Sequence, residues 1–240
     1  MIFTFSLQAQ DAQKFIVHED VVFPSKIAAY EAASKVFAET MEKHEATDAA
    51  FLTVSLDDNR YLYVSAIADF AALDSNPFKK VSEAMGEDAF GKMMSQYDGT
   101  FESHKNYVIN LSHDLSYNSN EIIMEGVNFR HFDYWYVTPG KWKEAKAIAK
   151  EWKDLYASKG VEQGYRVYTG GLGTEELLMV VSWAKSPEEF YSQRAKNREA
   201  LGDINDIMNR TMALTRKRES FDGMIRPELS YQPKSAMAEN

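Results

Sequence analysis

Apolar positions along the chain follow two different spacings, and their order predicts a repeated string of strands and helices. Residues 15–23 and 129–138 are rich in Val and aromatic side chains, which favours strands. Each is followed by a stretch in which apolar residues recur with the helical period, which predicts helices over 25–45 and 140–158. The further elements expected are strands over 51–56, 61–67, 105–111, 165–169, 177–183 and 219–225, a helix over 77–97, and a helix from Ser186-Pro187 to about Lys217 with a break at Gly202.

A nearly constant offset relates the first half of the sequence to the second. The helix-opening prolines Pro24 and Pro139 differ by 139 − 24 = 115 positions, and the similar segments that end in Tyr117 and Tyr231 differ by 231 − 117 = 114. Such an offset indicates an internal duplication. Each half has the order strand–helix–strand–strand–helix–strand, which is the ferredoxin-like unit.

The duplication predicts the organisation of the chain. We expect an N-terminal segment at 1–14, a first repeat at 15–117, a linker at 118–128, a second repeat at 129–231 and a disordered tail at 232–240. A ferredoxin-like sheet carries both helices on one face and leaves the other in need of a partner. The expected fold class is therefore α+β, with two tandem ferredoxin-like βαββαβ repeats packed as an intramolecular dimeric α/β barrel.

The element order, the two helix-opening prolines and the paired Leu-Ser-Tyr ends carry a resemblance to a known group of proteins. The chain resembles the dimeric α/β-barrel superfamily, which includes antibiotic-biosynthesis-type monooxygenases and NIPSNAP-like proteins. The resemblance spans Phe15 to Tyr231 and includes no family-specific catalytic motif. It implies a barrel that binds a small molecule, and a cofactor-independent oxygenation in which the bound substrate itself activates dioxygen.

Strand parity divides the side chains of each repeat's first strand between two faces. The apolar sets are expected to pack on the helices; they are Phe15, Val17, Val21 and Phe23 in the first repeat and Phe132, Tyr134 and Tyr136 in the second. The opposite faces, enclosed in a barrel, carry Ile16, His18, Asp20 and Val22, and His131, Asp133, Trp135 and Val137. Ionisable groups on an enclosed face are costly unless they are paired or solvated, which motivates a site there.

Four of these residues are the candidate catalytic groups: His18, Asp20, His131 and Asp133. An imidazole beside a carboxylate can act as a general base. The same His-x-Asp spacing would also suit a divalent metal. A third interpretation is that the groups form hydrogen-bonded pairs at a seam or face bulk water. All three interpretations stay open, and the catalytic candidates are named for a proton-transfer or ligand site without metal or cofactor.

Neighbouring strands supply the candidate binding residues. Because the first and last strands of a ferredoxin-like sheet are adjacent, His18 and Asp20 should lie beside His104 and Asn106. For the same reason His131 and Asp133 should lie beside Arg218 and Ser220, and Arg218 could hold a substrate anion. The residues assigned to substrate binding are His104, Asn106, Trp135, Arg218, Tyr63 and Trp183, of which the last two come from an aromatic wall predicted on the central strands.

Composition narrows the classes of partner. The 240 residues include no cysteine, so disulfides and thiolate catalysis are excluded. A formal net charge of −9 argues against general nucleic-acid binding, which depends on Lys and Arg. No apolar stretch approaches the roughly 20 residues of a membrane span. The expected partner is a small-molecule ligand, and a homo-oligomer stays open.

The first residues and the function leave alternatives. Residues 1–7 are apolar and precede Gln8-Ala9-Gln10, like the end of a signal peptide that lacks its basic region. If they are such a remnant, a periplasmic or secreted protein is expected, and otherwise a cytoplasmic one. The expected function is a small-molecule-binding barrel, oxygenase-like on an aromatic or lipophilic substrate. The alternative is a non-catalytic binding or protein-interaction module.

Overall fold

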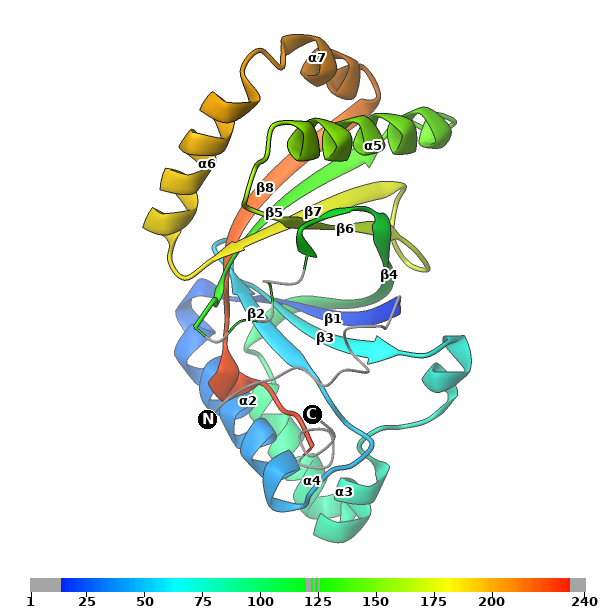
Figure 1. The fold of residues 1–240 in the computed structure, drawn as a ribbon. Helices are drawn as coiled ribbons and strands as arrows, with labels where there is room; N and C mark the ends of the chain where they lie inside the picture. Colours follow the sequence, from blue (N-terminus) through cyan, green and yellow to red (C-terminus); the bar gives the residue numbers. More distant parts are fainter. Residues whose placement is uncertain (1–13, 120–121, 123, 125, 234–240) are drawn as a thin grey trace. The chain divides into compact units, whose positions relative to one another are not determined.

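The computed structural model describes residues 14–119, 122, 124 and 126–233, and its elements repeat in one order (Figure 1). The N-terminal segment up to residue 13, the tail from 234 and parts of the linker lie outside the described residues. The first set of elements is β1 (Lys14–Val22), α2 (Ile27–Lys43), β2 (Leu52–Leu56), β3 (Arg60–Ile67), α3 (Lys79–Met85), α4 (Glu87–Met94) and β4 (Phe101–Tyr117). The second set is β5 (Phe129–Val137), α5 (Trp142–Ser158), β6 (Tyr165–Gly170), β7 (Leu177–Ala184), α6 (Pro187–Leu201), α7 (Asn205–Ala213) and β8 (Thr215–Ile225). Short 3-10 turns lie at Pro24–Lys26, Phe70–Asp74, Ser95–Tyr97 and Pro227–Leu229.

The duplication is visible in the lengths of the elements. Strands β1 and β5 each have 9 residues, and helices α2 and α5 each have 17. Both pairs keep the offset expected from the sequence, because 129 − 14 = 115 and 142 − 27 = 115. Positions in α2 can therefore be compared one by one with positions in α5.

The strand order closes into a barrel, β1-β3-β2-β8-β5-β7-β6-β4. The chain divides into two compact units: unit 1 is Met1–Tyr107 with Met224–Asn240, and unit 2 is Val108–Gly223. Strands β4 and β8 are each divided between the two units, with the boundaries after Tyr107 and after Gly223. The expected α+β barrel is confirmed. The limits expected for the two repeats stay a prediction.

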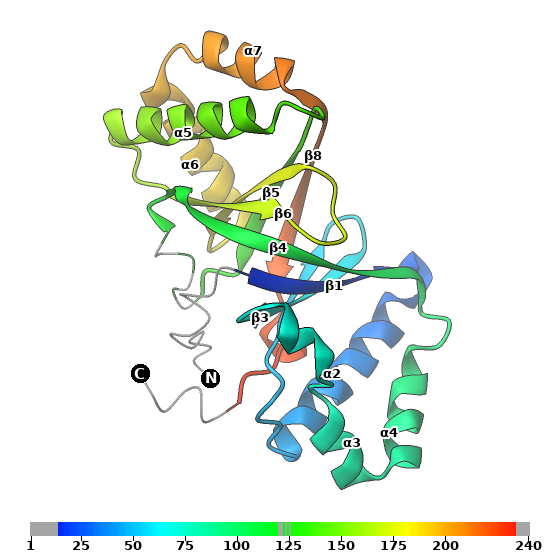
Figure 2. The ribbon, with the colours of Figure 1, turned by 90° about the vertical axis from the view of Figure 1, so that its right-hand side faces the viewer.

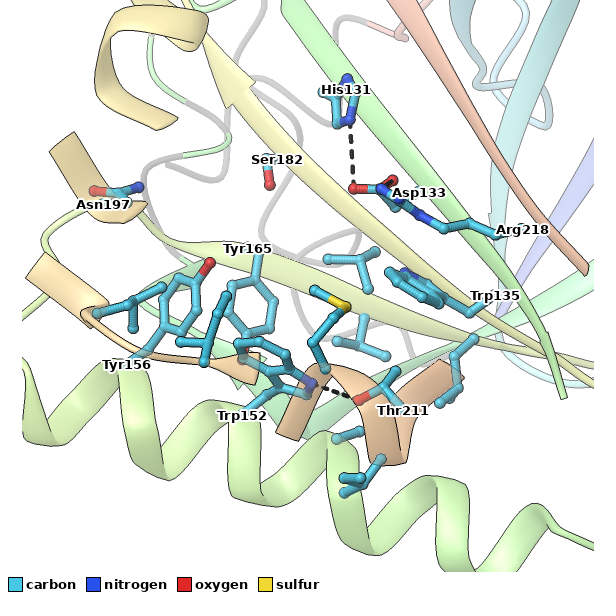
Figure 3. Close-up of a pocket in the computed structure, with 18 of the residues that line it drawn as sticks. His131, Asp133, Trp135, Trp152, Tyr156, Tyr165, Ser182, Asn197, Thr211 and Arg218 are labelled. Carbon is cyan, nitrogen blue, oxygen red and sulfur yellow. Dashed lines mark hydrogen bonds and ion pairs between the residues drawn. The ribbon is translucent and has the colours of Figure 1, made fainter. Parts of the chain in front are cut away.

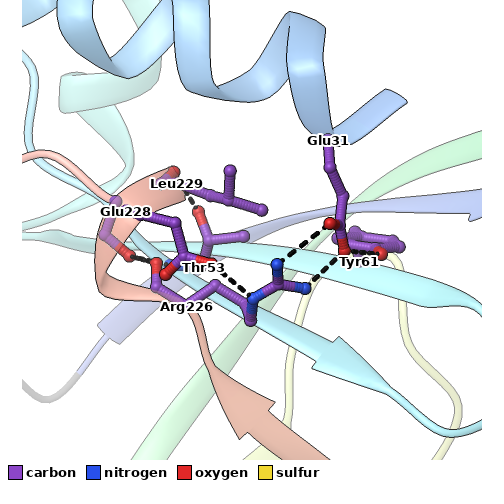
Figure 4. A network of polar contacts seen from close by, with 7 residues as sticks. Glu31, Thr53, Tyr61, Arg226, Glu228 and Leu229 are labelled. Carbon is purple, nitrogen blue, oxygen red and sulfur yellow. Dashed lines mark hydrogen bonds and ion pairs between the residues drawn. The ribbon is translucent and has the colours of Figure 1, made fainter. Parts of the chain in front are cut away.

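Each unit carries its helices on one face of its own sheet, with α2, α3 and α4 in unit 1 and α5, α6 and α7 in unit 2 (Figure 2). Helix α2 is tied to the unit 1 sheet by Glu31, which accepts hydrogen bonds from Arg226 and from the Tyr61 hydroxyl (Figure 4). Thr53 donates to the Leu229 carbonyl at 2.6 Å, which joins the segment that follows β8 to β2.

The expectation that the apolar sets of β1 and β5 face the helices was wrong. Val22, on the His18–Asp20 face of β1, packs against Tyr30 of α2, and Val137, on the His131–Asp133 face of β5, packs against Ala145 of α5. The apolar sets lie on the face away from the helices, where Phe15 and Val17 are 6% and 1% exposed. In a closed barrel that face is enclosed as well, so apolar character does not identify the helix side.

Two element boundaries also differ from expectation. The last helix ends at Ala213, and β8 begins at Thr215, so Arg216-Lys217-Arg218 is extended strand rather than the end of a helix. The helix expected over 77–97 is two helices that meet at Gly86, whose φ of +84° lies in the region that glycine adopts without strain.

Candidate functional site

Unit 2 contains a cavity of about 320 Å³ between its sheet and its helices (Figure 3). Strands β5, β6, β7 and β8 form one wall, and α5, α6 and α7 form the other. The volume lies at the lower end of the roughly 300–1,000 Å³ range of small-molecule sites. The cavity is therefore large enough for a small organic molecule.

Most of the wall is aliphatic and aromatic. Trp152 of α5 lines the cavity together with Ile148, Leu201 and Met208. The indole N–H of Trp152 donates to the Thr211 hydroxyl at 2.9 Å, which joins α5 to α7. This bond holds the indole in one orientation and leaves its ring available for contact with a ligand.

Tyr165 of β6 adds a polar group to this apolar region. Its ring is 5.2 Å from that of Tyr156 in an edge-to-face arrangement. Tyr165 is 7% exposed, and its hydroxyl has no hydrogen-bond partner in the described part of the chain. Burial raises the pKa of this phenol, so it stays protonated at neutral pH. A buried hydroxyl without a partner costs free energy that a polar ligand atom can recover.

Charged side chains from β5 and β8 gather at one side of the cavity (Figure 3). Nδ1 of His131 is 2.7 Å from Asp222, and its Nε2 is 3.4 Å from Asp133. Asp133 also accepts hydrogen bonds from Arg218 at 2.6 Å and from Ser220 at 2.5 Å. His131 therefore lies between two carboxylates, one of which is itself held by a guanidinium.

These contacts set the protonation states. Burial lowers the pKa of His131, but the hydrogen bonds to Asp133 and Asp222 and the charge of Asp133 outweigh burial, so the pKa is raised overall. Burial alone would raise the pKa of Asp133, whereas hydrogen bonds from His131, Ser220 and Arg218 lower it well below its usual range. At neutral pH Asp133 is a carboxylate, and a proton on His131 is stabilised.

Arg194 of α6 favours the unprotonated form of His131, whereas Asp133 and Asp222 favour the protonated form. One of its guanidinium nitrogens lies 3.0 Å from Nε2 of the ring. A guanidinium can only donate, so this contact requires an unprotonated Nε2. The contact between Nε2 and Asp133 requires a proton on the same nitrogen. His131 thus has one partner for its neutral form and another for its charged form.

The structure brings four of the sequence-predicted residues into this cavity: His131, Asp133, Trp135 and Arg218. Arg218 lies beside Asp133 as expected, and its guanidinium lies 4.6 Å from the centre of the Trp135 ring. Trp183 does not belong to the group, because it pairs with Arg130 in the β5–β7 register and so faces the other side of the sheet from His131.

The unit 1 candidates also meet, but in a different setting. His18 lies 3.0 Å from Asp20 and 2.9 Å from Asn106, with the His104 and Tyr63 rings 5.6 and 6.0 Å away. Burial lowers the pKa of His18, yet the hydrogen bond and charge of Asp20, together with the hydrogen bond to Asn106, raise it overall. Asp20 accepts a 2.5 Å hydrogen bond from Tyr30, a fully buried side chain of α2.

Sequence reasoning missed several residues of the cavity. Asp222 shares a strand face with Arg218 and Ser220, so parity could have placed it beside His131. Arg194, Arg198 and Tyr165 had no such signal, because their role depends on which side of α6 or β6 meets the cavity.

Comparisons with known proteins identify the fold. No protein-family model matches the sequence, and no curated protein is similar to it. The crystal structure of an anthrone oxidase-like protein is 16% identical, with 92% of this chain and 94% of that chain covered and a TM-score of 0.57. A candidate monooxygenase from Fusobacterium nucleatum subsp. nucleatum ATCC 25586 gives 14% identity, 89% and 92% coverage and a TM-score of 0.55. Another from Lactobacillus acidophilus NCFM gives 9% identity, 93% and 97% coverage and a TM-score of 0.52.

The chain has the dimeric α/β-barrel fold. At identities of 9–16% these likenesses show the fold and not the reaction. Within the described ranges, no helix has the length and apolar character needed to cross a membrane. The described residues likewise contain no cluster of three or more His, Cys, Asp or Glu side chains arranged to hold a metal ion.

Proposed function

We propose that unit 2 binds a small aromatic or lipophilic molecule in its cavity and acts on it as a cofactor-independent oxygenase. The observation that carries this proposal is the position of His131 at the charged side of an otherwise aromatic and aliphatic cavity. There a base meets a largely desolvated substrate, which strengthens every polar interaction between them.

The first chemical step is a proton transfer. Nε2 of neutral His131 takes a proton from an activated C–H or O–H of the substrate, and the ring becomes an imidazolium. Asp222 at Nδ1 holds the orientation of the ring, and Asp133 stabilises the added charge on the Nε2 side. Arg218 and the Tyr165 hydroxyl are donors for the anion that forms on the substrate.

The following steps need dioxygen as co-substrate and no further redox partner. The substrate anion supplies its electrons to dioxygen, a carbon–oxygen bond forms, and the peroxide anion takes up a proton. Loss of water from this hydroperoxide leaves a carbonyl group. For a ring methylene the balance is CH2 + O2 → C=O + H2O, in which carbon is oxidised and dioxygen is reduced.

The structural neighbours support this choice among enzyme classes. Two carry the description of candidate monooxygenases and one that of an anthrone oxidase-like protein, and each shares the fold over most of its length. His18, Asp20, His104, Asn106 and Tyr63 have no catalytic part in the proposal, because Tyr30 occupies the space next to Asp20.

The test is oxygen consumption by the purified full-length protein with anthrone as probe. His131→Gln should lower the rate about 10²–10⁴-fold, the usual contribution of a general base. His18→Gln is the matched control, since it removes an imidazole from a similar His-x-Asp pair in unit 1. Equal rates for wild type and His131→Gln would refute the catalytic role. Binding of anthrone without oxygen consumption in the wild type would leave a non-catalytic binding protein.

A further inference from the structure

We infer that the ligand of the unit 2 cavity carries a carboxylate or similar anionic group, which draws Arg194 away from His131 and so uncovers the base. The inference rests on the proposed function in one respect, because it takes the cavity to be the ligand site. It adds a feature of the ligand and a positioning residue, Arg194, that controls when Nε2 of His131 can accept a proton.

The charges around the cavity are unbalanced in favour of an anion. The whole chain is acidic, with a formal net charge of −9. The lining nevertheless contains the guanidinium groups of Arg194, Arg198 and Arg218 and only one carboxylate, that of Asp133. Of these arginines, Arg218 alone forms a salt bridge to a described carboxylate within 4.0 Å. Asp222, whose carboxylate contacts Nδ1 of His131, lowers this excess of positive charge but does not remove it.

The two arginines without a carboxylate belong to one face of α6. Arg194 and Arg198 are four residues apart, so their side chains are neighbours on the helix surface. Both are exposed residues, and both line the cavity, which places them where the cavity meets solvent. Two guanidinium groups in this arrangement suit a carboxylate, which offers two acceptor oxygens. The apolar part of such a ligand would then point toward Trp152.

Arg194 has a second contact that couples this anion site to the chemistry. Its guanidinium donates to the unprotonated Nε2 of His131 at 3.0 Å and lies 5.9 Å from the centre of the Phe190 ring. While this contact holds, the lone pair that would accept the substrate proton is occupied. Arg194 therefore masks the base when no competing acceptor is present.

An anionic ligand group changes this balance. A hydrogen bond between a guanidinium and a carboxylate is about twice as strong as one between neutral groups, and stronger than the contact with a neutral imidazole. Arg194 accordingly moves to the ligand, and Nε2 becomes free to take a proton. Once Nε2 is protonated, it can donate to the carboxylate of Asp133, which lies 3.4 Å away. Binding of the correct ligand thus precedes activation of the base.

Several groups face His131 and contribute to its titration. Asp133 is on the same strand, Asp222 is on β8, and Arg194 and Tyr191 are on α6. The Tyr191 hydroxyl donates to Asp222 at 2.7 Å, and Arg218 acts through Asp133. Of these groups, only Arg194 needs Nε2 to be unprotonated, so its removal should act on that nitrogen.

The experiment is ¹⁵N NMR of the histidine side chains in the full-length protein, at a pH where His131 is neutral. In the wild type, Nε2 of His131 should have the chemical shift of an unprotonated nitrogen that accepts a hydrogen bond. Addition of 1-naphthoate should move it toward the value of an unbonded nitrogen, whereas neutral 1-naphthalenemethanol should not. His18, whose ring nitrogens contact Asp20 and Asn106, is the reference in the same spectrum.

Two substitutions on α6 separate the coupling from general effects of charge. Arg194→Leu should give the unbonded Nε2 shift without any ligand and raise the pKa of His131, because the charge of Arg194 lowers it. Arg198→Leu removes an equal charge one turn away and should keep the hydrogen-bonded Nε2. An unchanged His131 in Arg194→Leu would overturn the inference, as would a wild-type Nε2 that does not respond to bound 1-naphthoate.

The inference and the proposed function fail separately. If Nε2 responds as expected but His131→Gln consumes oxygen like the wild type, the anion site stands and the oxygenase proposal falls. If His131→Gln is inactive while Nε2 ignores bound 1-naphthoate, the base stands and the role of Arg194 falls. If 1-naphthoate does not bind at all, the assignment of an anionic aromatic ligand is wrong.

Discussion

Tyr30 in unit 1 and Ala145 in unit 2 occupy corresponding positions, because α2 and α5 keep the 115-residue offset. Tyr30 is completely buried, and its hydroxyl donates to Asp20. Ala145 has only a methyl group at that place, and it lines the cavity. The difference between Tyr30 and Ala145 therefore leaves open in unit 2 a space that a side chain fills in unit 1.

The central strands extend the same difference. Tyr63 pairs with His18 in β1–β3, and Val180 pairs with Asp133 in β5–β7, so the two positions correspond. By the same registers Tyr61 of unit 1 corresponds to Leu178 of unit 2. Further along the helices unit 2 has the larger side chains, because Trp152 and Tyr156 of α5 correspond to Phe37 and Met41 of α2. Unit 2 thus has its large aromatic side chains around the cavity.

Hydrogen bonding separates the units as clearly as volume does. In unit 1 the tyrosines bond to neighbours: Tyr30 to Asp20, Tyr61 to Glu31 and Tyr63 to Ser34. In unit 2 the Tyr165 hydroxyl has no described partner. A set of polar groups that satisfies itself stabilises the fold, whereas an unsatisfied one is available to a ligand. The two units therefore share a fold, but at these corresponding positions unit 1 has bonded tyrosines and unit 2 has a cavity.

We expect the greatest loss of stability when the buried Tyr30 side chain of unit 1 is removed. Tyr30→Ala should lower the free energy of unfolding by about 3–5 kcal/mol, because it leaves a cavity and removes a buried hydrogen bond. Tyr156→Ala in unit 2 should cost less, about 1–2 kcal/mol, since part of its surroundings is already hollow. Urea denaturation of both variants measures the difference. Equal losses would mean that the two units are packed alike.

The second expected effect is a loss of ligand affinity when a larger side chain fills the unit 2 cavity. Ala145→Tyr places in unit 2 the side chain that occupies unit 1, and it should weaken binding of 1-naphthoate about a hundredfold or more, equivalent to about 2.7 kcal/mol. Isothermal titration calorimetry gives the affinity. Ala147→Tyr is the matched control, because Ala147 is exposed on the same helix and does not line the cavity. Unchanged binding to Ala145→Tyr would place the ligand elsewhere.

Parity and strand adjacency were enough to predict that His131, Asp133 and Arg218 come together, since both follow from the order of elements. The side of the sheet could not be predicted in the same way. Both faces of a closed barrel are buried, so Val17 and Val22 are equally inaccessible, at 1% and 2% exposure, although they face opposite sides.

The cavity itself has no local signal in the sequence. It depends on the sizes of Ala145, Leu178 and Val180 relative to their counterparts, which become comparable only once the registers are known. Arg194 was hidden for a related reason. A helix with charged residues on several sides does not reveal which of them meets a cavity, and α6 has arginine, lysine and glutamate throughout.

Removing one tyrosine hydroxyl from each unit is expected to have a smaller effect on stability. Tyr30→Phe should cost about 1–3 kcal/mol of unfolding free energy, because buried Asp20 loses a donor. Tyr165→Phe should change stability by less than about 0.5 kcal/mol or increase it slightly, because no described partner is lost. Urea denaturation again supplies the numbers. A large loss from Tyr165→Phe would show that its hydroxyl has a structural role.

The smallest expected effect is the pH dependence contributed by the two His-x-Asp pairs. The pKa of both His18 and His131 is raised in the folded protein. Their stabilisation is therefore fully present below the unfolded pKa of about 6.5 and is lost as the pH rises through the folded pKa. His18→Gln and His131→Gln should each destabilise the protein more at about pH 5.5 than at about pH 8.5. Thermal unfolding at the two pH values measures this.

The same experiment distinguishes the units through Arg194. Its charge opposes protonation of His131, while the hydrogen bonds and charge around His18 come from Asp20 and Asn106. In an Arg194→Leu background the pH-dependent cost of His131→Gln should therefore grow, and that of His18→Gln should stay the same. Asp133, whose folded pKa is lowered, has the opposite sign: its contribution is present above the unfolded value of about 3.9 and is lost as the pH falls. A parallel growth at both histidines would mean that Arg194 acts through the overall charge of the protein and not through its contact with Nε2.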